Sequence, residues 1–130
     1  CGVGTLTGST ASTFTFDGSG GTTASQTLTY QRVGNWVTLN IPAVTGTTGT
    51  NSTVLASNTA LPAAIRPTAI QSGAVLSVIN NNAVVAGAGI ITISTGGVIS
   101  IARDGTGTAT FTNTATAGTN LATSITYFIG

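Results

Sequence analysis

The sequence predicts an all-β domain built from antiparallel strands. Apolar and polar side chains alternate with a period of two along the chain, as they do in a strand with one buried face. Thr makes up about a fifth of the residues; its β-branched side chain favours strands, and its hydroxyl tolerates water. Gly, Asn, Asp or Pro bounds each alternating run, as strand ends require.

Each expected strand is marked by apolar residues two positions apart. In chain order these are Phe14 and Phe16; Leu28 and Tyr30; Val37, Leu39 and Ile41; Ile91 and Ile93; Ile99 and Ile101; Ala109 and Phe111; and Ile125, Tyr127 and Ile129. With the less regular runs included, we expect about eight to ten strands, at the spacing of a two-sheet antiparallel sandwich. We expect residues 1–130 to form a single jelly-roll domain, with residues 1–4 as a candidate linker or spacer.

The turns between these strands are also visible in the sequence. Gly34-Asn35 predicts a two-residue hairpin with a positive φ at Gly34, and Gly96-Gly97 predicts a second hairpin of the same kind. Asn80-Asn81-Asn82 predicts a polar turn. The segment Leu61–Ile70 has apolar residues at helix-like spacing, but its two prolines hold the preceding residues in extended geometry. No helix of useful length is therefore expected.

Charge is nearly absent from the chain. Only 4% of the residues are charged and the net charge is +1, whereas globular domains carry roughly 25%. The charged residues are Arg32, Arg66, Arg103, Asp17 and Asp104. Nucleic acids and anionic lipids require clustered Lys and Arg, so neither is an expected partner. The longest apolar run, residues 83–93, is too short for membrane insertion.

Most catalytic and metal-binding chemistry is excluded by composition. The chain has no His, Lys or Glu, so a serine nucleophile has no base to activate it. One cysteine without histidine does not form a zinc site, and two aspartates are too few for calcium. We expect no catalytic residues, no metal and no cofactor. The single Cys1 is read as part of a spacer rather than as a lipid-modified N-terminus.

Two strands are apolar on both faces. Trp36 alternates with Val37 and Leu39, and Phe128 lies between Tyr127 and Ile129. A half-buried sheet of a monomer normally has a polar outer face. The pattern therefore favours burial of this face against another subunit over a strand that is covered on both sides within one chain.

Five segments in order resemble the C-terminal tip domains of trimeric phage tail fibres and related bacterial fibre adhesins. The matching region spans about residues 28–130. The segments are Tyr30–Leu39 (Y-x-R-x-G-N-x-V-x-L), Leu61–Pro67 (L-P-A-x-x-R-P), Gly97–Ile101 (G-x-I-x-I), Phe111-Thr112 and Ile125–Ile129 (I-T-Y-x-I). The resemblance implies a jelly roll of the tumour-necrosis-factor or C1q type that assembles as a homotrimer at the end of a fibre.

The same resemblance implies an extracellular place, on a virion tail fibre or a bacterial surface. It also implies a receptor-binding or adhesive function, directed at a cell-surface glycan or protein. No catalytic set is shared within the family. The low charge of this chain departs from the group and argues against a ligand held by ion pairs.

Five residues are candidates for ligand contact on the grounds of expected exposure: Asn80, Asn81, Asn82, Trp36 and Asp104. The asparagines suit sugar hydroxyls but equally suit an exposed turn. Trp36 fits a core or subunit contact better than a sugar platform, and Asp104 beside Arg103 fits a solvated turn pair better than a ligand clamp. Arg66 is expected to anchor a loop by donating to carbonyls.

Two other function classes remain beside the receptor-binding tip. A purely structural trimerisation or capping module would need no ligand. Ice binding is suggested by Thr-x-Thr triplets, of which 5–7 is the first, but the fixed repeat that a regular Thr ladder requires is missing. An enzyme is the least favoured class.

Overall fold

The computed structural model describes residues 5–9, 16–18, 21–22, 27–47, 54–75, 77–85, 87–103, 116–119 and 121–130. Within these residues the chain is all-β, and every strand pairing is antiparallel, which confirms the predicted fold class. The expected strand at Ala109 and Phe111 and the start of the one at Phe14 lie outside the described residues.

The described residues form fourteen strands and one short 3₁₀ turn, η1. Their bounds are β1 (Thr5–Ser9), β2 (Phe16–Gly18), β3 (Gly21–Thr22), β4 (Thr29–Val33), β5 (Trp36–Ile41), β6 (Thr45–Thr47), β7 (Val54–Ser57), η1 (Ala63–Ile65), β8 (Gln71–Val75), β9 (Val78–Asn80), β10 (Ala83–Val84), β11 (Gly89–Ile93), β12 (Ile99–Ala102), β13 (Thr116–Thr119) and β14 (Thr123–Phe128).

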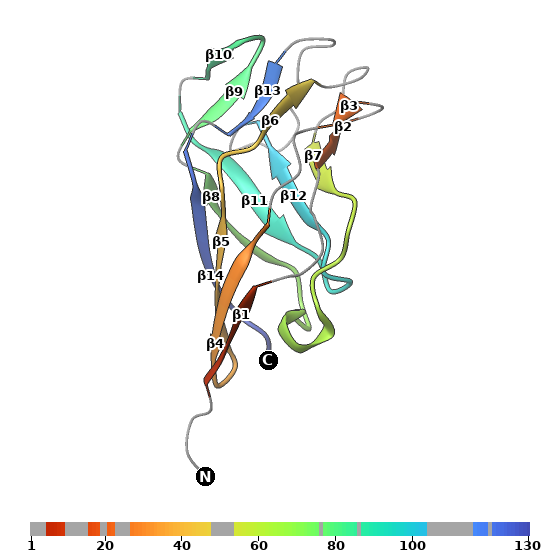
Figure 1. Ribbon diagram of the computed structural model, residues 1–130, viewed down its shortest axis with the longest axis vertical. Coiled ribbons are helices and arrows are strands. Elements are labelled where there is room, and N and C mark those ends of the chain that lie inside the picture. Colours follow the sequence, from red (N-terminus) through yellow and green to blue (C-terminus); the bar gives the residue numbers. More distant parts are fainter. Residues whose placement is uncertain are drawn as a thin grey trace.

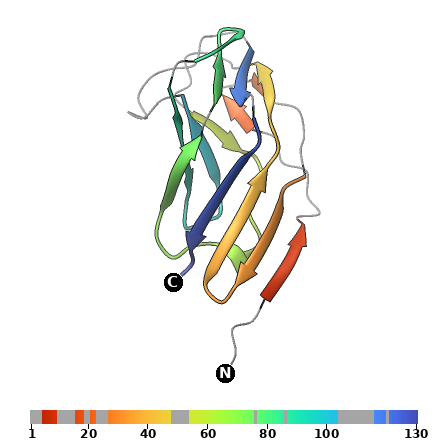
Figure 2. The same ribbon diagram turned by 90° about the vertical axis from the view of Figure 1, so that its left-hand side faces the viewer.

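Among the described strands, hydrogen bonds connect three sheets rather than the two predicted. Their strand orders are β1-β4-β5-β14, β3-β2-β7-β12-β11-β8 and β10-β9-β13-β6. The first two sheets form the sandwich, and β8 runs beside β14 at one of its edges (Figures 1 and 2). The third sheet lies at the end of the molecule remote from the N-terminus.

The third sheet continues the first one beyond a break. β5 pairs with β14, and β6, the next strand after β5, pairs with β13, the strand before β14. Pro42 follows β5 directly, and proline has no N–H to donate to a sheet ladder. The break is bridged by the Val44 amide, which donates to Thr119 Oγ1 at 3.1 Å, and by the Thr119 amide, which donates to the Val44 carbonyl at 2.7 Å.

The core lies between the four-stranded sheet of β1, β4, β5 and β14 and the six-stranded sheet. The burial pattern alternates along β5 and β14, and the inward residues are those that the period-two pattern predicts. The fully or nearly buried members are Val37, Leu39, Ile41, Leu55, Ile91, Ile93, Ile99, Ile101, Ile125 and Tyr127. Burial of such side chains is the main favourable contribution to folding.

One of the two predicted glycine hairpins is confirmed. Gly34 and Asn35 join β4 to β5 as a two-residue turn, and Gly34 has φ 60°. The Gly96-Gly97 prediction is wrong in loop length. The Gly97 amide bonds to the Ser94 carbonyl at 2.9 Å, and the Ser94 amide bonds to the Val98 carbonyl at 3.0 Å. This is a three-residue loop, in which Gly97 alone takes the positive φ, 83°.

The segment before β8 contains no long helix, as the prolines predict, and η1 is its only helical turn. Side chains of the first sheet hold η1 in place. Arg32 Nη1 donates to the Ala64 carbonyl at 2.6 Å, and the Tyr127 hydroxyl donates to the Ile65 carbonyl at 2.7 Å. The expected loop anchor is confirmed, because Arg66 Nε donates to the Leu61 carbonyl at 2.7 Å.

The start of β1 and the C-terminus lie toward the same end of the elongated molecule, whereas the β9–β10 hairpin lies at the opposite end (Figure 1). We call this opposite end, which is formed by β6, β9, β10 and β13, the distal end. No helix in the described part of the chain is long and apolar enough to cross a membrane.

Candidate functional site

The distal end carries the asparagine turn predicted from the sequence. Asn80 pairs with Ala83 across the β9–β10 hairpin, so Asn81 and Asn82 are its two loop residues. Both have a positive φ, 52° and 64°. A two-residue turn with positive φ at both positions is type I′, and asparagine tolerates this conformation better than other residues with a side chain. The turn geometry therefore explains two of the three asparagines without any ligand.

The three asparagines are not equally accessible. Asn81 and Asn82 are exposed, but Asn80 is only 7% exposed, so the expectation that all three are exposed is wrong for Asn80. Asn80 alternates with Ile79 and shares the inward side of β9 with the buried Val78. The candidate ligand contacts on this turn are therefore the amides of Asn81 and Asn82.

An exposed apolar side chain accompanies these amides. Val84 is 59% exposed, and it lies opposite Ile79 on the outward side of the hairpin. Sequence reasoning missed Val84 as a site residue, since the alternation of β10, two residues long, is too short to show which side faces out. Amides beside an apolar surface suit the hydroxyls and C–H groups of an uncharged sugar or a polar peptide.

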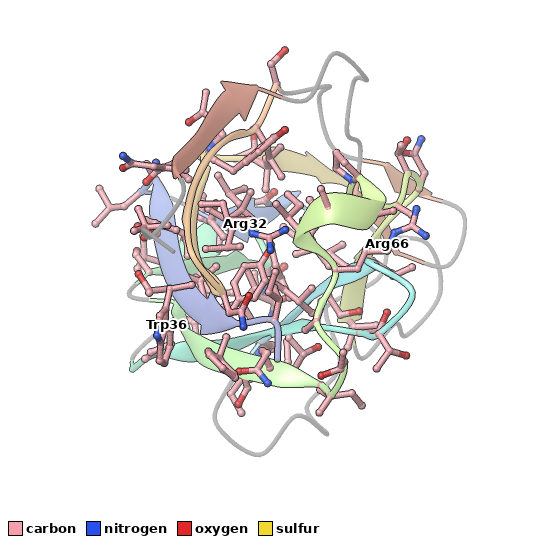
Figure 3. All side chains as sticks on the ribbon, turned by 90° about the horizontal axis from the view of Figure 1, so that it is seen from below. Arg32, Trp36 and Arg66 are labelled. Atoms are coloured by element: carbon pink, nitrogen blue, oxygen red, sulfur yellow. The ribbon has the colours of Figure 1, made fainter. Side chains whose placement is uncertain are left out.

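Trp36 lies far from the asparagine turn. It begins β5 at the end of the molecule that carries both termini, and its side chain points outward (Figure 3). It is 55% exposed and packs on Phe128, which is 40% exposed, with ring centroids 4.9 Å apart and planes tilted by 56°. A place in the core of this chain is therefore excluded. Trp36 and the asparagines do not form one site.

The remaining candidates add little charge to the distal end. Asp104 lies outside the described residues. Arg103, which follows β12, is half-buried and engaged in an interaction. Arg32 and Arg66 lie near the opposite end (Figure 3), where they bond to backbone carbonyls. The described residues contain no group of three or more His, Cys, Asp or Glu side chains placed to hold a metal ion.

Comparison with known proteins identifies the fold. No family model matches the sequence, and no curated protein matches it either. Among solved structures, a reovirus attachment protein, sigma1, in complex with α-2,3-sialyllactose matches with a TM-score of 0.56 and 18% identity. The match covers 97% of this chain and 67% of that one. The chain has the fold of a viral attachment protein.

In this attachment-protein fold, the described residues offer two distinct surfaces. The distal end presents the Asn81 and Asn82 amides beside the apolar side chain of Val84, without a described acidic side chain. The other surface is the outward face of the four-stranded sheet, where Trp36 and Phe128 lie. The sequence indicated the second surface through strands that are apolar on both faces, and the structure shows those side chains exposed.

Proposed function

We propose that this chain is the receptor-binding head of a trimeric fibre, of the kind found on phage tails or bacterial adhesins. It would be exposed on a virion or a cell surface and would bind a cell-surface glycan or protein without catalysing a reaction. The observation that carries the proposal is the likeness to a viral attachment protein over 97% of the chain. The arrangement of the molecule supports it, because a fibre shaft joined to the N-terminus would leave the distal end free (Figure 1).

The chemistry of the distal end favours an uncharged ligand. Asn81 and Asn82 are exposed there and can donate to and accept from sugar hydroxyls. The sigma1 structure contains sialyllactose, whose sialic acid is negatively charged. In this chain Arg32 and Arg66 are engaged near the other end. We therefore expect binding to persist after sialidase treatment of the target cells, and loss of binding would overturn the expectation of an uncharged ligand.

The sharpest test of the site removes the two amides and keeps the turn. Glycine adopts positive φ freely, so Asn81→Gly together with Asn82→Gly preserves the type I′ backbone. If these amides bind the ligand, we expect binding to target cells or immobilised glycans to weaken by about tenfold, equivalent to about 1.4 kcal/mol. Thr68→Ser, an exposed change outside the distal end, serves as the control. If the parent chain, the double glycine variant and the control bind equally well, the asparagine turn is not part of the binding site.

The alternative function is a structural trimerisation or capping module. The exposed Trp36–Phe128 pair near the chain termini favours it, since assembly alone would explain that pair. The two functions differ in one measurement: a receptor-binding head added in excess should block attachment of the parent particle or cell. A structural module should leave attachment unchanged.

A further inference from the structure

The outward face of the four-stranded sheet is ordered in rows across β4, β5 and β14, which lie side by side (Figure 2). The strand register aligns Val33, Trp36 and Phe128 in the first row; Gln31, Thr38 and Thr126 in the second; and Thr29, Asn40 and Ser124 in the third. We call these nine residues the outer face. Because side chains alternate along each strand, the nine share one side of the sheet and their neighbours face the other side.

The outer face combines one apolar row with two rows of hydrogen-bonding side chains. In the first row Trp36, which is 55% exposed, lies between the exposed Val33 and Phe128. The second and third rows contain only hydroxyl and amide side chains, and none of the nine residues is ionisable. Successive rows are about 7 Å apart and neighbouring strands about 4.8 Å apart. The outer face is therefore a neutral patch of roughly 300 Å².

Trp36 and the two threonines of the second row are held in place by their neighbours. Phe128 packs on the Trp36 ring, with centroids 4.9 Å apart and planes tilted by 56°, and this contact restricts rotation of the indole. Thr38 and Thr126 bond to each other through their Oγ1 atoms at 3.1 Å. Only one of the two hydroxyls donates in this bond, so the pair retains an O–H donor and acceptor lone pairs for a ligand. Groups ordered in this way lose little conformational entropy on binding.

The size and polarity of the outer face argue against a second protein chain as its occupant. Each partner in a stable protein interface buries about 800 Å², well above the area of this patch. Burial of the six hydroxyl and amide side chains against protein would also require a hydrogen-bond partner for each of them. The apolar row, which in the sequence favours a subunit contact, comprises only three side chains and has polar rows beside it.

We propose that the outer face binds a neutral polysaccharide, at a site separate from the asparagine turn. A sugar ring has an apolar C–H face, which stacks on an exposed indole, and a rim of hydroxyls, which match the donors and acceptors of the second and third rows. The polysaccharide lies along β5, with one ring on Trp36 and the following rings over Thr38 and Asn40. This second site does not depend on the receptor-binding function proposed for the distal end.

The first test uses the fluorescence of Trp36, the only tryptophan of the chain. Dextran, laminarin or galactomannan, three neutral polysaccharides, is added to the whole chain. We expect at least one of them to shift the emission to shorter wavelength and to protect Trp36 from quenching by acrylamide. Absence of a response to all three would overturn the proposal.

Hyaluronan, an anionic polysaccharide, tests the preference for a neutral ligand. Its carboxylates would lose water on the outer face without meeting a cation there. The Trp36 response should therefore require a distinctly higher concentration of hyaluronan than of the neutral polysaccharide. Equal responses would contradict a neutral ligand.

Matched substitutions test where the polysaccharide binds. Thr126→Val keeps the shape of the side chain and removes its hydroxyl, and Trp36 remains as the reporter. We expect the affinity for the polysaccharide to fall by about three- to tenfold. The double variant Asn81→Gly, Asn82→Gly should bind the polysaccharide as the parent chain does. Unchanged affinity in Thr126→Val, or a loss of affinity in the glycine variant, would exclude the outer face as the site.

A further copy of this chain is the competing occupant of the outer face, and the parent chain without polysaccharide distinguishes the two. At micromolar concentration acrylamide should quench Trp36 strongly, as its exposure implies. Weak quenching would show that another copy covers Trp36, and the proposed site would then be wrong. The distal end is tested separately, because the glycine variant reports on cell binding and not on Trp36.

Discussion

At the scale of single residues, Tyr127 connects the core to the η1 segment. It is 2% exposed, and its hydroxyl donates to the Ile65 carbonyl at 2.7 Å. Tyr127→Phe would leave a buried carbonyl without this donor, so we expect the free energy of unfolding to fall by about 1–3 kcal/mol. Urea unfolding at neutral pH measures the change. Tyr30→Phe, at a partly exposed position, is the control and should cost less.

Tyr127 also predicts how stability depends on alkaline pH. Burial raises the pKa of the Tyr127 hydroxyl well above its ordinary value of 10.0. Because the folded state holds the phenol neutral, its contribution is complete below about pH 10 and is lost as the pH rises beyond the unfolded pKa. Thermal unfolding followed from about pH 8 to 11 should show this decline in the parent chain. A decline equally steep in Tyr127→Phe would show that another group causes it.

Gly118 is a second residue that the fold specifies closely. It has φ 143°, a conformation nearly restricted to glycine, and a Cβ there would overlap the Val44 carbonyl. Gly87 is a matched control, since it has φ 86° but open space around it. We expect Gly87→Ala to cost about 1–2 kcal/mol from backbone strain alone, and Gly118→Ala to cost distinctly more. Equal losses in chemical unfolding would contradict the overlap at Val44.

At the scale of elements, Arg32 joins the β4–β5 turn to η1. Its Nε donates to the Gly34 carbonyl at 2.7 Å and its Nη1 to the Ala64 carbonyl at 2.6 Å. Lysine keeps the positive charge, but it lacks the planar guanidinium group with which Arg32 makes both bonds. We expect Arg32→Lys to lower the free energy of unfolding by about 1–2 kcal/mol and to speed hydrogen exchange at the Ile65 amide. Unchanged exchange would mean that η1 is held without Arg32.

The elements that the sequence predicts well are those defined by local periodicity. β5 and β14 alternate over six residues each, and the structure buries the expected face of both. The loop at Gly96-Gly97 was predicted too short, because its length depends on the bond between Ser94 and Val98, which glycine content alone does not specify. The third sheet was not predicted, since β6 pairs with β13, a strand far along the chain.

The candidate site, like the strands, was predictable only where it depends on local sequence. An exposed asparagine turn follows from local turn chemistry, and Asn81 and Asn82 confirm that exposure. The burial of Asn80 depends on the pairing of β9 with β13, whose position the local sequence does not reveal. Trp36 and the asparagine turn lie at opposite ends of the molecule. This placement also depends on the strand topology, which the local sequence does not reveal.

At the scale of the whole molecule, charge is nearly absent, and the two surfaces differ instead in their apolar and hydrogen-bonding side chains. The outward face of the four-stranded sheet carries the exposed Trp36 and Phe128, whereas the distal end displays the Asn81 and Asn82 amides and the exposed Val84. The chain as a whole has a net charge of only +1, so the proposed recognition would depend on shape, hydrogen bonds and apolar contact rather than on electrostatic steering. The stability of the molecule should show the same independence from charge.

The last prediction is that stability is nearly constant around neutral pH. The chain has no His, Lys or Glu, and in unfolded chains aspartate ionises near pH 4 and tyrosine near pH 10. Few protons are therefore exchanged on unfolding between about pH 5 and 7.5. We expect Tm to change by less than about 2 °C over this range, and equally little between about 0.05 and 0.5 M salt. The measurement requires a fixed protein concentration, because assembly of copies, if it occurs, would also change Tm. A larger change with salt would show that a charged contact contributes to stability, whereas a larger change between about pH 5 and 7.5 would show that folding raises the pKa of Asp17 or Asp104 into this range.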